Sequence, residues 1–207
     1  MTLALAPLGA AVGCREARAE GLSQAELLRI ERGETVVRPQ TLDLEGHRYV
    51  GGVTYTIVAA TPEELTALMD DESAYGQVLP RAKFVRRLDR TRDRSTPDAS
   101  RDAYMEVHHG NALIDAAYTL HLKKEPEHAR IRFWVDLSRP HDLEDAWGYF
   151  RYAALPGDGG PRVLLTYGAL VNLGNGIVRS LYEERIRVAM LSLPQRLRDY
   201  VARTRRR

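Results

Sequence analysis

The 207-residue chain has a single cysteine, Cys14, so it cannot form an intrachain disulfide. It lacks a Gly-x-Ser-x-Gly element, which would present a nucleophilic serine, and a glycine-rich loop between a strand and a helix, which would hold a phosphate. Its formal net charge is only +2, which provides no overall field for attracting nucleic acid. These absences argue against a disulfide-stabilised protein, a serine hydrolase, a nucleotide-dependent enzyme and a nucleic-acid-binding protein.

Metal ligands are also scarce, because the six histidines never recur at the convergent spacing that a metal site needs. His108 and His109 are adjacent within a predicted strand, so their side chains point to opposite faces and cannot share one ion. His141 and Asp142 belong to a polar loop that we interpret as solvated. The sequence therefore predicts neither a metal nor another cofactor.

The N-terminus has the texture of an export signal. Residues 1–13 carry no charged side chain and are mostly Leu, Ala, Gly and Val, a run too short to span a membrane as a helix. The run ends in Ala11-Val12-Gly13-Cys14, which resembles a bacterial lipobox, although Leu is usual where Ala11 stands. We therefore predict that residues 1–19 are a leader and that the protein is exported, either periplasmic or lipid-anchored through Cys14. The alternative is an apolar N-terminus on a cytoplasmic protein.

Two capping boxes mark short helices early in the chain. Ser23 and Glu26 open a helix over residues 24–31, and Thr61 and Glu64 open a second one that runs to about residue 69. Residues 35–38 read as a strand that Pro39 restricts to a sheet edge or a strand end. We assign residues 20–47 to an N-terminal extension of helix and strand.

The middle of the chain is nearly all strand. Residues 49–60 are rich in Val, Tyr, Thr and Ile, with a predicted bulge at Gly51 and Gly52. Six further strands are expected at residues 84–92, 103–109, 113–123, 130–137, 146–155 and 162–171. Because hairpin-length turns join most of them, a meander is the simplest topology. We expect Ala116, Gly148 and Gly168 to be small residues on the inner face.

Residues 175–201 read as one long amphipathic helix, with Ile186, Met190, Leu193, Leu197 and Tyr200 along one face. Pro194 lies within this pattern and predicts a kink near residues 190–191. The chain is therefore predicted to be α+β, with a curved antiparallel sheet of six to seven strands wrapped around a long C-terminal helix and two short helices after the first strand. This domain spans residues 48–203, and residues 204–207 form a basic tail that is either a frayed end or weakly attracted to anionic headgroups.

Four stretches resemble the START/SRPBCC superfamily, in particular its polyketide cyclase/dehydrase and coenzyme Q-binding (Coq10-like) helix-grip proteins. They are residues 55–69, where Thr-Pro-Glu-Glu joins a strand to a helix, residues 75–80, the hairpin of residues 147–151 and 163–167, and the terminal helix. Their order and spacing cover residues 53–201. The chain departs from the family at Leu65, where a tryptophan is common, and in its N-terminal extension.

The resemblance implies a hydrophobic cavity between the sheet and the terminal helix, occupied by a lipid, sterol, polyketide or quinone-like ligand. A ligand would pass between the terminal helix and the loops that follow Pro80 and Arg139. The same inward-facing residues would otherwise make an ordinary packed core. The expected walls of the cavity are Tyr118, Phe133, Phe150, Ile177, Leu181 and Met190.

We therefore predict a monomeric protein that binds or transports a hydrophobic small molecule and is not an enzyme. A cyclase-type enzyme is the first alternative, with an acid or base in the cavity, and a ligand-free interaction module of the cell envelope is the second. The candidate acids and bases are Asp115, His109, His121, Asp136 and Arg151, each of which could equally be a charge on the solvent face of a strand. Asp115 and His121 share a face opposite Tyr118, which favours the solvent-facing interpretation for these two.

Overall fold

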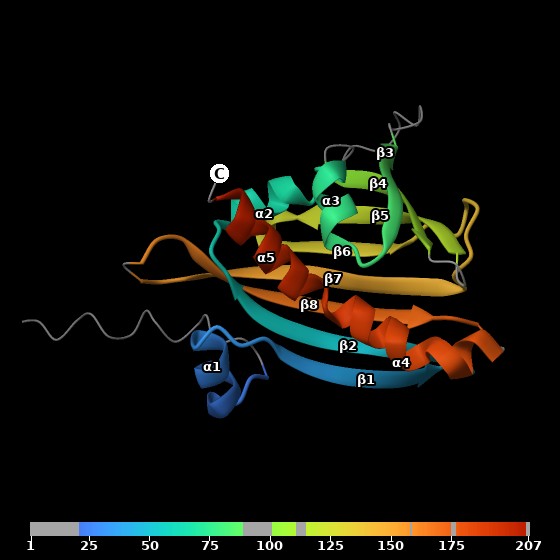
Figure 1. The fold of residues 1–207 in the computed structure, drawn as a ribbon, viewed down its shortest axis with the longest axis horizontal. Coiled ribbons are helices and arrows are strands. Elements are labelled where there is room, and N and C mark those ends of the chain that lie inside the picture. The colour runs from blue at the N-terminus through green and yellow to red at the C-terminus, as the bar shows by residue number, and fades with distance from the viewer. Residues whose placement is uncertain (1–20, 89–100, 111–114, 158, 175–176, 206–207) are drawn as a thin grey trace, which may run out of the picture.

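The computed structural model describes residues 21–88, 101–110, 115–157, 159–174 and 177–205, except for the side chains of residues 177–181. It consists of one antiparallel sheet, with a long bent C-terminal helix lying across one face and α1 beside the β1 edge (Figure 1). The predicted leader, including Cys14, lies outside the described residues, and so do most of the polar loop expected over residues 92–101 and the turn residue Asn111.

The sheet has eight described strands, in the spatial order β1-β2-β8-β7-β6-β5-β4-β3. Their bounds are β1 (Val36–Leu44), β2 (His47–Val58), β3 (Ala82–Leu88), β4 (Asp102–Gly110), β5 (Asp115–Glu125), β6 (Arg130–Val135), β7 (Asp145–Leu155) and β8 (Arg162–Asn172). The count exceeds the expected six to seven because β1 pairs with β2 along its whole length and so joins the same sheet. Pro39 lies in this edge strand, as its missing N–H requires.

The predicted meander is right for β3 to β8 and wrong for β2, which pairs with β8 instead of β3. The connection from β2 to β3 carries α2 (Pro62–Leu68) and α3 (Glu72–Val78), and it delivers the chain to the opposite edge of the sheet. Figure 1 shows α2, α3 and the terminal helix on the same face of the sheet. This crossing places two helices beside the terminal helix, over the face that holds the main hydrophobic core.

Both predicted capping boxes are confirmed. Ser23 and Glu26 cap α1 (Gln24–Glu31) reciprocally, and Thr61 and Glu64 do the same for α2, which has Pro62 in its first turn. The helix α1 covers a small second core on the other face of the sheet, which consists of Ile30, Val36, Tyr55 and Leu164.

The terminal helix is divided into α4 (Ile177–Leu191) and α5 (Leu193–Thr204), with the break at Ser192. The predicted kink therefore lies one or two residues later than expected, and its cause is Pro194, which cannot donate a backbone hydrogen bond. The buried hydroxyl of Thr54 in β2 donates to the Leu191 carbonyl at 3.0 Å, so the break is tied to the centre of the sheet.

Gly51 and Gly52 do not form the predicted bulge, because the pairing of β2 with β1 and with β8 shows no register shift there. Their role is to allow close approach of two backbones. A Cβ atom on Gly51 would lie 1.9 Å from the Ala169 carbonyl oxygen, and one on Gly52, whose φ is +145°, would lie 2.1 Å from the Arg38 carbonyl oxygen.

The expected inner-face position of Gly168 is also wrong. Gly168 pairs with Tyr149 in β7, and a Cβ atom at this position would lie 2.5 Å from the Tyr149 ring, so the glycine accommodates that ring on the outer face. Gly148 does belong to the inner face, where its missing side chain is covered by the ring of Phe133.

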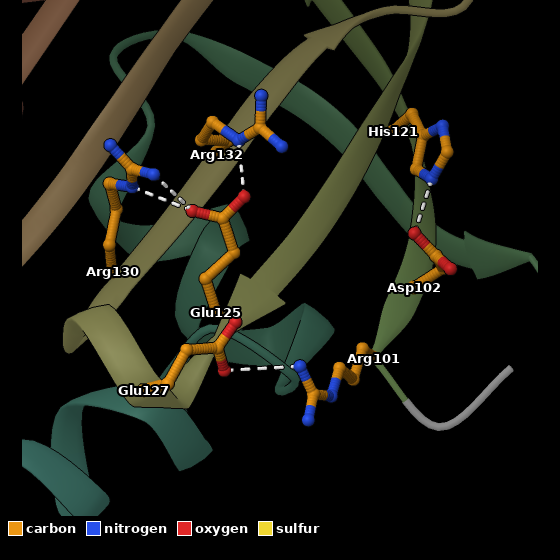
Figure 2. Close-up of polar contacts among 7 residues, drawn as sticks. All are labelled: Arg101, Asp102, His121, Glu125, Glu127, Arg130 and Arg132. Carbon is orange, nitrogen blue, oxygen red and sulfur yellow. Dashed lines mark hydrogen bonds and ion pairs between the residues drawn. The ribbon is translucent and has the colours of Figure 1, made fainter. Parts of the chain in front are cut away.

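A buried carboxylate lies at the end of β5, where the chain turns into β6. Glu125, whose side chain is only 8% exposed, accepts from Arg130 Nε at 2.7 Å and from Arg132 Nε at 2.5 Å (Figure 2). Burial alone would raise the pKa of Glu125, but these two guanidinium groups hold it below its ordinary value. In the same view Glu127 pairs with Arg101 at 3.0 Å, with half of its side chain exposed.

We expect Glu125→Gln to lower the free energy of unfolding by about 2 kcal/mol at pH 7, because two guanidinium groups lose their charged acceptor. Since the pKa is lowered in the folded state, this contribution is present above the unfolded-state pKa and is lost as the pH falls through the folded-state value. Urea unfolding should therefore show the difference from the wild type shrinking below about pH 4. Glu127→Gln is the matched control, with an expected loss under about 1 kcal/mol. Equal losses in the two variants would contradict the prediction.

Candidate functional site

A cavity of about 900 Å³ lies between the inner face of the sheet and the terminal helix. Most of its walls are apolar. The strands contribute Ala116, Tyr118, Leu120, Leu122, Phe133, Ala146, Phe150, Tyr167, Ala169 and Val171. The helices contribute Tyr75, Ile186, Ala189, Met190 and Leu193, and Leu79 follows the end of α3. Side chains alternate along each strand, so every second residue of β5 from Ala116 to Leu122 faces the cavity.

Four of the six predicted wall residues line this cavity, namely Tyr118, Phe133, Phe150 and Met190. The side chains of Ile177 and Leu181 lie outside the described part of the chain. Direct contact of any of the six predicted wall residues with a ligand stays a prediction.

An aromatic cluster on the strands forms part of the cavity wall. The ring centroids of Phe150 and Tyr167 are 4.9 Å apart, and Phe133 lies 5.6 Å from Phe150 and 6.0 Å from Tyr167. Tyr167 was not among the predicted wall residues, although alternation along residues 162–171 could have placed it beside its register partner Phe150. Within the described residues its hydroxyl has no hydrogen-bond partner, so this group is available to a ligand.

The main polar feature of the wall is a bonded pair, His109 and Tyr118. His109 Nδ1 lies 2.9 Å from the Pro80 carbonyl oxygen, which can only accept, so Nδ1 carries the proton. Nε2 then accepts from the Tyr118 hydroxyl at 2.7 Å. Burial lowers the pKa of His109 and raises that of Tyr118, so both groups are held neutral.

We expect the His109 imidazole to titrate below its ordinary pKa of about 6.5, because burial keeps water away from the charged form of the ring. The test is an NMR titration of the histidine ring signals, with His109→Gln used to assign the one that disappears. A titration of this signal above 6.5 would mean that the ring is solvated or paired with a charge, which would contradict the geometry.

The other predicted acids and bases do not reach the cavity. Asp115 is exposed and pairs with Lys83 at 2.9 Å. Asp136 accepts from Ser138 and Arg139 in its own loop. Arg151 is exposed and is absent from the cavity wall.

His121 lies on the outer face, as its alternation with Tyr118 predicted. It bonds Asp102 at 2.8 Å (Figure 2), and its ring stacks on Tyr104 and lies tilted against Trp134. His108 and His109 likewise point to opposite faces, since His108 bonds Glu106 on the outside. Among the described residues, no group of three or more His, Cys, Asp or Glu side chains is placed to hold a metal ion.

The cavity also has polar residues that the sequence analysis did not single out, namely Arg81, Glu184, Arg185 and Arg196. All four are exposed, so they lie where the cavity meets solvent. Arg81 directly follows Pro80, where the sequence analysis placed one side of the ligand entrance, but no pattern in the sequence singled out its side chain. As for the membrane, none of the described helices combines the length and the apolar character that crossing a bilayer requires.

No protein-family model and no curated protein sequence matches the chain, but solved structures do. The STAR-related lipid transfer protein from Xanthomonas axonopodis superposes with a TM-score of 0.58 at 15% identity, over 80% of this chain and 93% of that one. TTHA0849 from Thermus thermophilus superposes with a TM-score of 0.54 at 18% identity, over 73% of this chain and 97% of that one. The Zhui aromatase/cyclase from Streptomyces sp. R1128 superposes with a TM-score of 0.51 at 14% identity, over 82% of this chain and 95% of that one.

At these identities the likeness shows the fold. The chain has a START/SRPBCC-type helix-grip fold, which confirms the fold predicted from the order of elements in the sequence.

Proposed function

We propose that the protein binds and carries a hydrophobic small molecule in the cavity between the sheet and the terminal helix. The observation that carries the proposal is the cavity of about 900 Å³ with mostly apolar walls. Well-packed protein cores leave few voids larger than a water molecule. A space of this size therefore argues against the alternative of a core filled by its own side chains, and it matches the volumes of small-molecule sites.

The wall chemistry supports an apolar ligand. Burying apolar surface contributes roughly 25 cal/mol per Å², so micromolar affinity needs little polar anchoring. The names of two structural neighbours, a lipid transfer protein and an aromatase/cyclase, agree with a role for the cavity in holding such a ligand. The His109–Tyr118 pair and the free Tyr167 hydroxyl would orient one oxygen-bearing group of the ligand.

A cyclase-type enzyme is the second candidate, because the same His109–Tyr118 pair places a base and an acid in the cavity wall. We favour the carrier, since burial weakens both groups for proton transfer near neutral pH. A lowered pKa makes His109 a weaker base, and a raised pKa makes Tyr118 a weaker acid. Turnover of a polyketide-like substrate that is lost in His109→Gln and retained in His108→Gln would reverse this preference.

The test of the carrier function is native mass spectrometry of gently purified protein, followed by solvent extraction of whatever is bound. A stoichiometric hydrophobic adduct is the expected result, and its mass would give the chemical class. A clean protein mass, with no thermal shift against a panel of lipids and quinones, would overturn the proposal and favour the interaction module.

We further propose that the protein is exported, with a lipid on Cys14 as one form of the mature chain. The support is the uncharged run of residues 1–13 and the small residues before Cys14. Mass spectrometry of the mature N-terminus in a bacterial host would decide. An intact Met1 or its simple removal would contradict export.

A further inference from the structure

Three exposed arginines line the cavity where it meets solvent. Arg81 lies between α3 and β3, Arg185 is in α4 and Arg196 is in α5, and all three belong to the cavity lining. We call these residues the rim arginines. The turn between α3 and β3 supplies one of these arginines and the terminal helix supplies the other two, so they come from separate parts of the fold.

The rim arginines differ from most arginines described in the structure because they have no carboxylate partner there. On the same terminal helix, Arg187 pairs with Glu183 and with Glu184, each at 3.2 Å. Within the described residues, none of the rim arginines forms an ion pair, and their one specific side-chain contact is that of the Arg185 guanidinium over the Tyr182 ring at 5.7 Å. Their positive charges are therefore available to a ligand.

The only carboxylate among the described lining residues is Glu184, and Arg187 already pairs with it. The opening is therefore positive, whereas the interior is apolar. Arg81 is also held in place by its backbone, since its carbonyl accepts from the Gly110 N–H at 3.2 Å next to His109. The position of the Arg81 backbone relative to the cavity wall is thus set by the pairing of β3 with β4.

From this arrangement we infer that the ligand is amphipathic, with an apolar body inside the cavity and a single anionic group, a carboxylate or a phosphate, at the rim arginines. The inference rests on the proposed function and names its ligand class. An anion at the rim would stay partly hydrated and close to positive charge, so it would avoid the cost of entering the apolar interior.

The experiment compares three ligands with the same alkyl chain, each measured by calorimetry on the full protein at a concentration at which the ligand stays dissolved. Palmitate carries a carboxylate, hexadecyl phosphate carries a phosphate, and hexadecanol is neutral. We expect the two anions to bind about tenfold more tightly than the alcohol, from up to three partly exposed charge contacts. The advantage should fall as ionic strength rises.

The variant Arg81→Gln/Arg185→Gln/Arg196→Gln should remove this advantage, so that the anions and hexadecanol bind the variant with similar affinity. Arg203→Gln is the matched control, since Arg203 is an exposed arginine of α5 outside the cavity lining. Whichever anion loses more affinity in the triple variant identifies the head group. Equal binding of all three ligands would overturn the inference and leave the proposed function standing, whereas no binding of any of them would overturn both.

Discussion

Replacing Ala116 by phenylalanine is expected to weaken ligand binding more than tenfold while the protein remains folded. Ala116 lines the cavity from the start of β5, close to where Tyr118 bonds His109. A benzyl group at this position would occupy space that the ligand needs. The new ring would add apolar contacts inside a cavity that is large enough to receive it, so overpacking should cost less than about 1 kcal/mol of stability.

Ala117→Phe is the matched control, because Ala117 is the next residue of the same strand and points to the outer face. It pairs with His108, near the exposed Phe84, where another aromatic ring is tolerated. Calorimetry with the extracted ligand and thermal unfolding of both variants give the comparison. Unchanged affinity in Ala116→Phe would place the ligand elsewhere, and equal weakening in both variants would point to general disruption of the sheet.

The fold could be predicted largely from local patterns. The two capping boxes named the starts of α1 and α2, and the alternation of apolar residues gave β4 to β8 within a few residues. Alternation also separated the faces of β5, which is why Tyr118 was predicted in the cavity and His121 outside it. These features depend on neighbours within about ten residues, so the sequence carries them directly.

The errors concern distant pairings. The pairing of β2 with β8 joins residues more than one hundred positions apart, and no turn or spacing specifies it. The glycines show the same limitation, because Gly168 was placed on the inner face without knowledge of the Tyr149 ring beside it. A glycine within a strand indicates that a neighbouring group lies close to its backbone, but only the three-dimensional structure identifies that group.

The candidate site also combines features that local patterns predict with features that depend on distant contacts. Its apolar walls follow from strand alternation, whereas the bond between His109 and Tyr118 depends on the β4–β5 register, which aligns His109 with Ala116. Arg81 and Arg196 are far apart in the sequence and line the same cavity because α3 and α5 pack together, so neither residue stood out among the many arginines of the chain.

Gly51→Ala is expected to lower the free energy of unfolding by about 3 kcal/mol, at the upper end of what overpacking costs. The φ angle of Gly51 does not lie in the left-handed region, so the backbone conformation itself would suit alanine. The cost is steric, since the new Cβ would lie 1.9 Å from the carbonyl oxygen of Ala169, a backbone atom that cannot rotate away. The strands β2 and β8 would have to separate.

The control is Gly76→Ala in α3, where a Cβ would meet nothing within 4 Å, and which should stabilise the protein by about 0.5–1 kcal/mol because alanine favours a helix. Because Ala169 also lines the cavity, a folded Gly51→Ala protein should bind its ligand more weakly in proportion to how far β8 moves. Urea unfolding and ligand titration of the two variants test both effects. A neutral Gly51→Ala would mean that β2 and β8 are not held this close, and the width of the cavity would then have to be set by the terminal helix through Thr54 and Leu191.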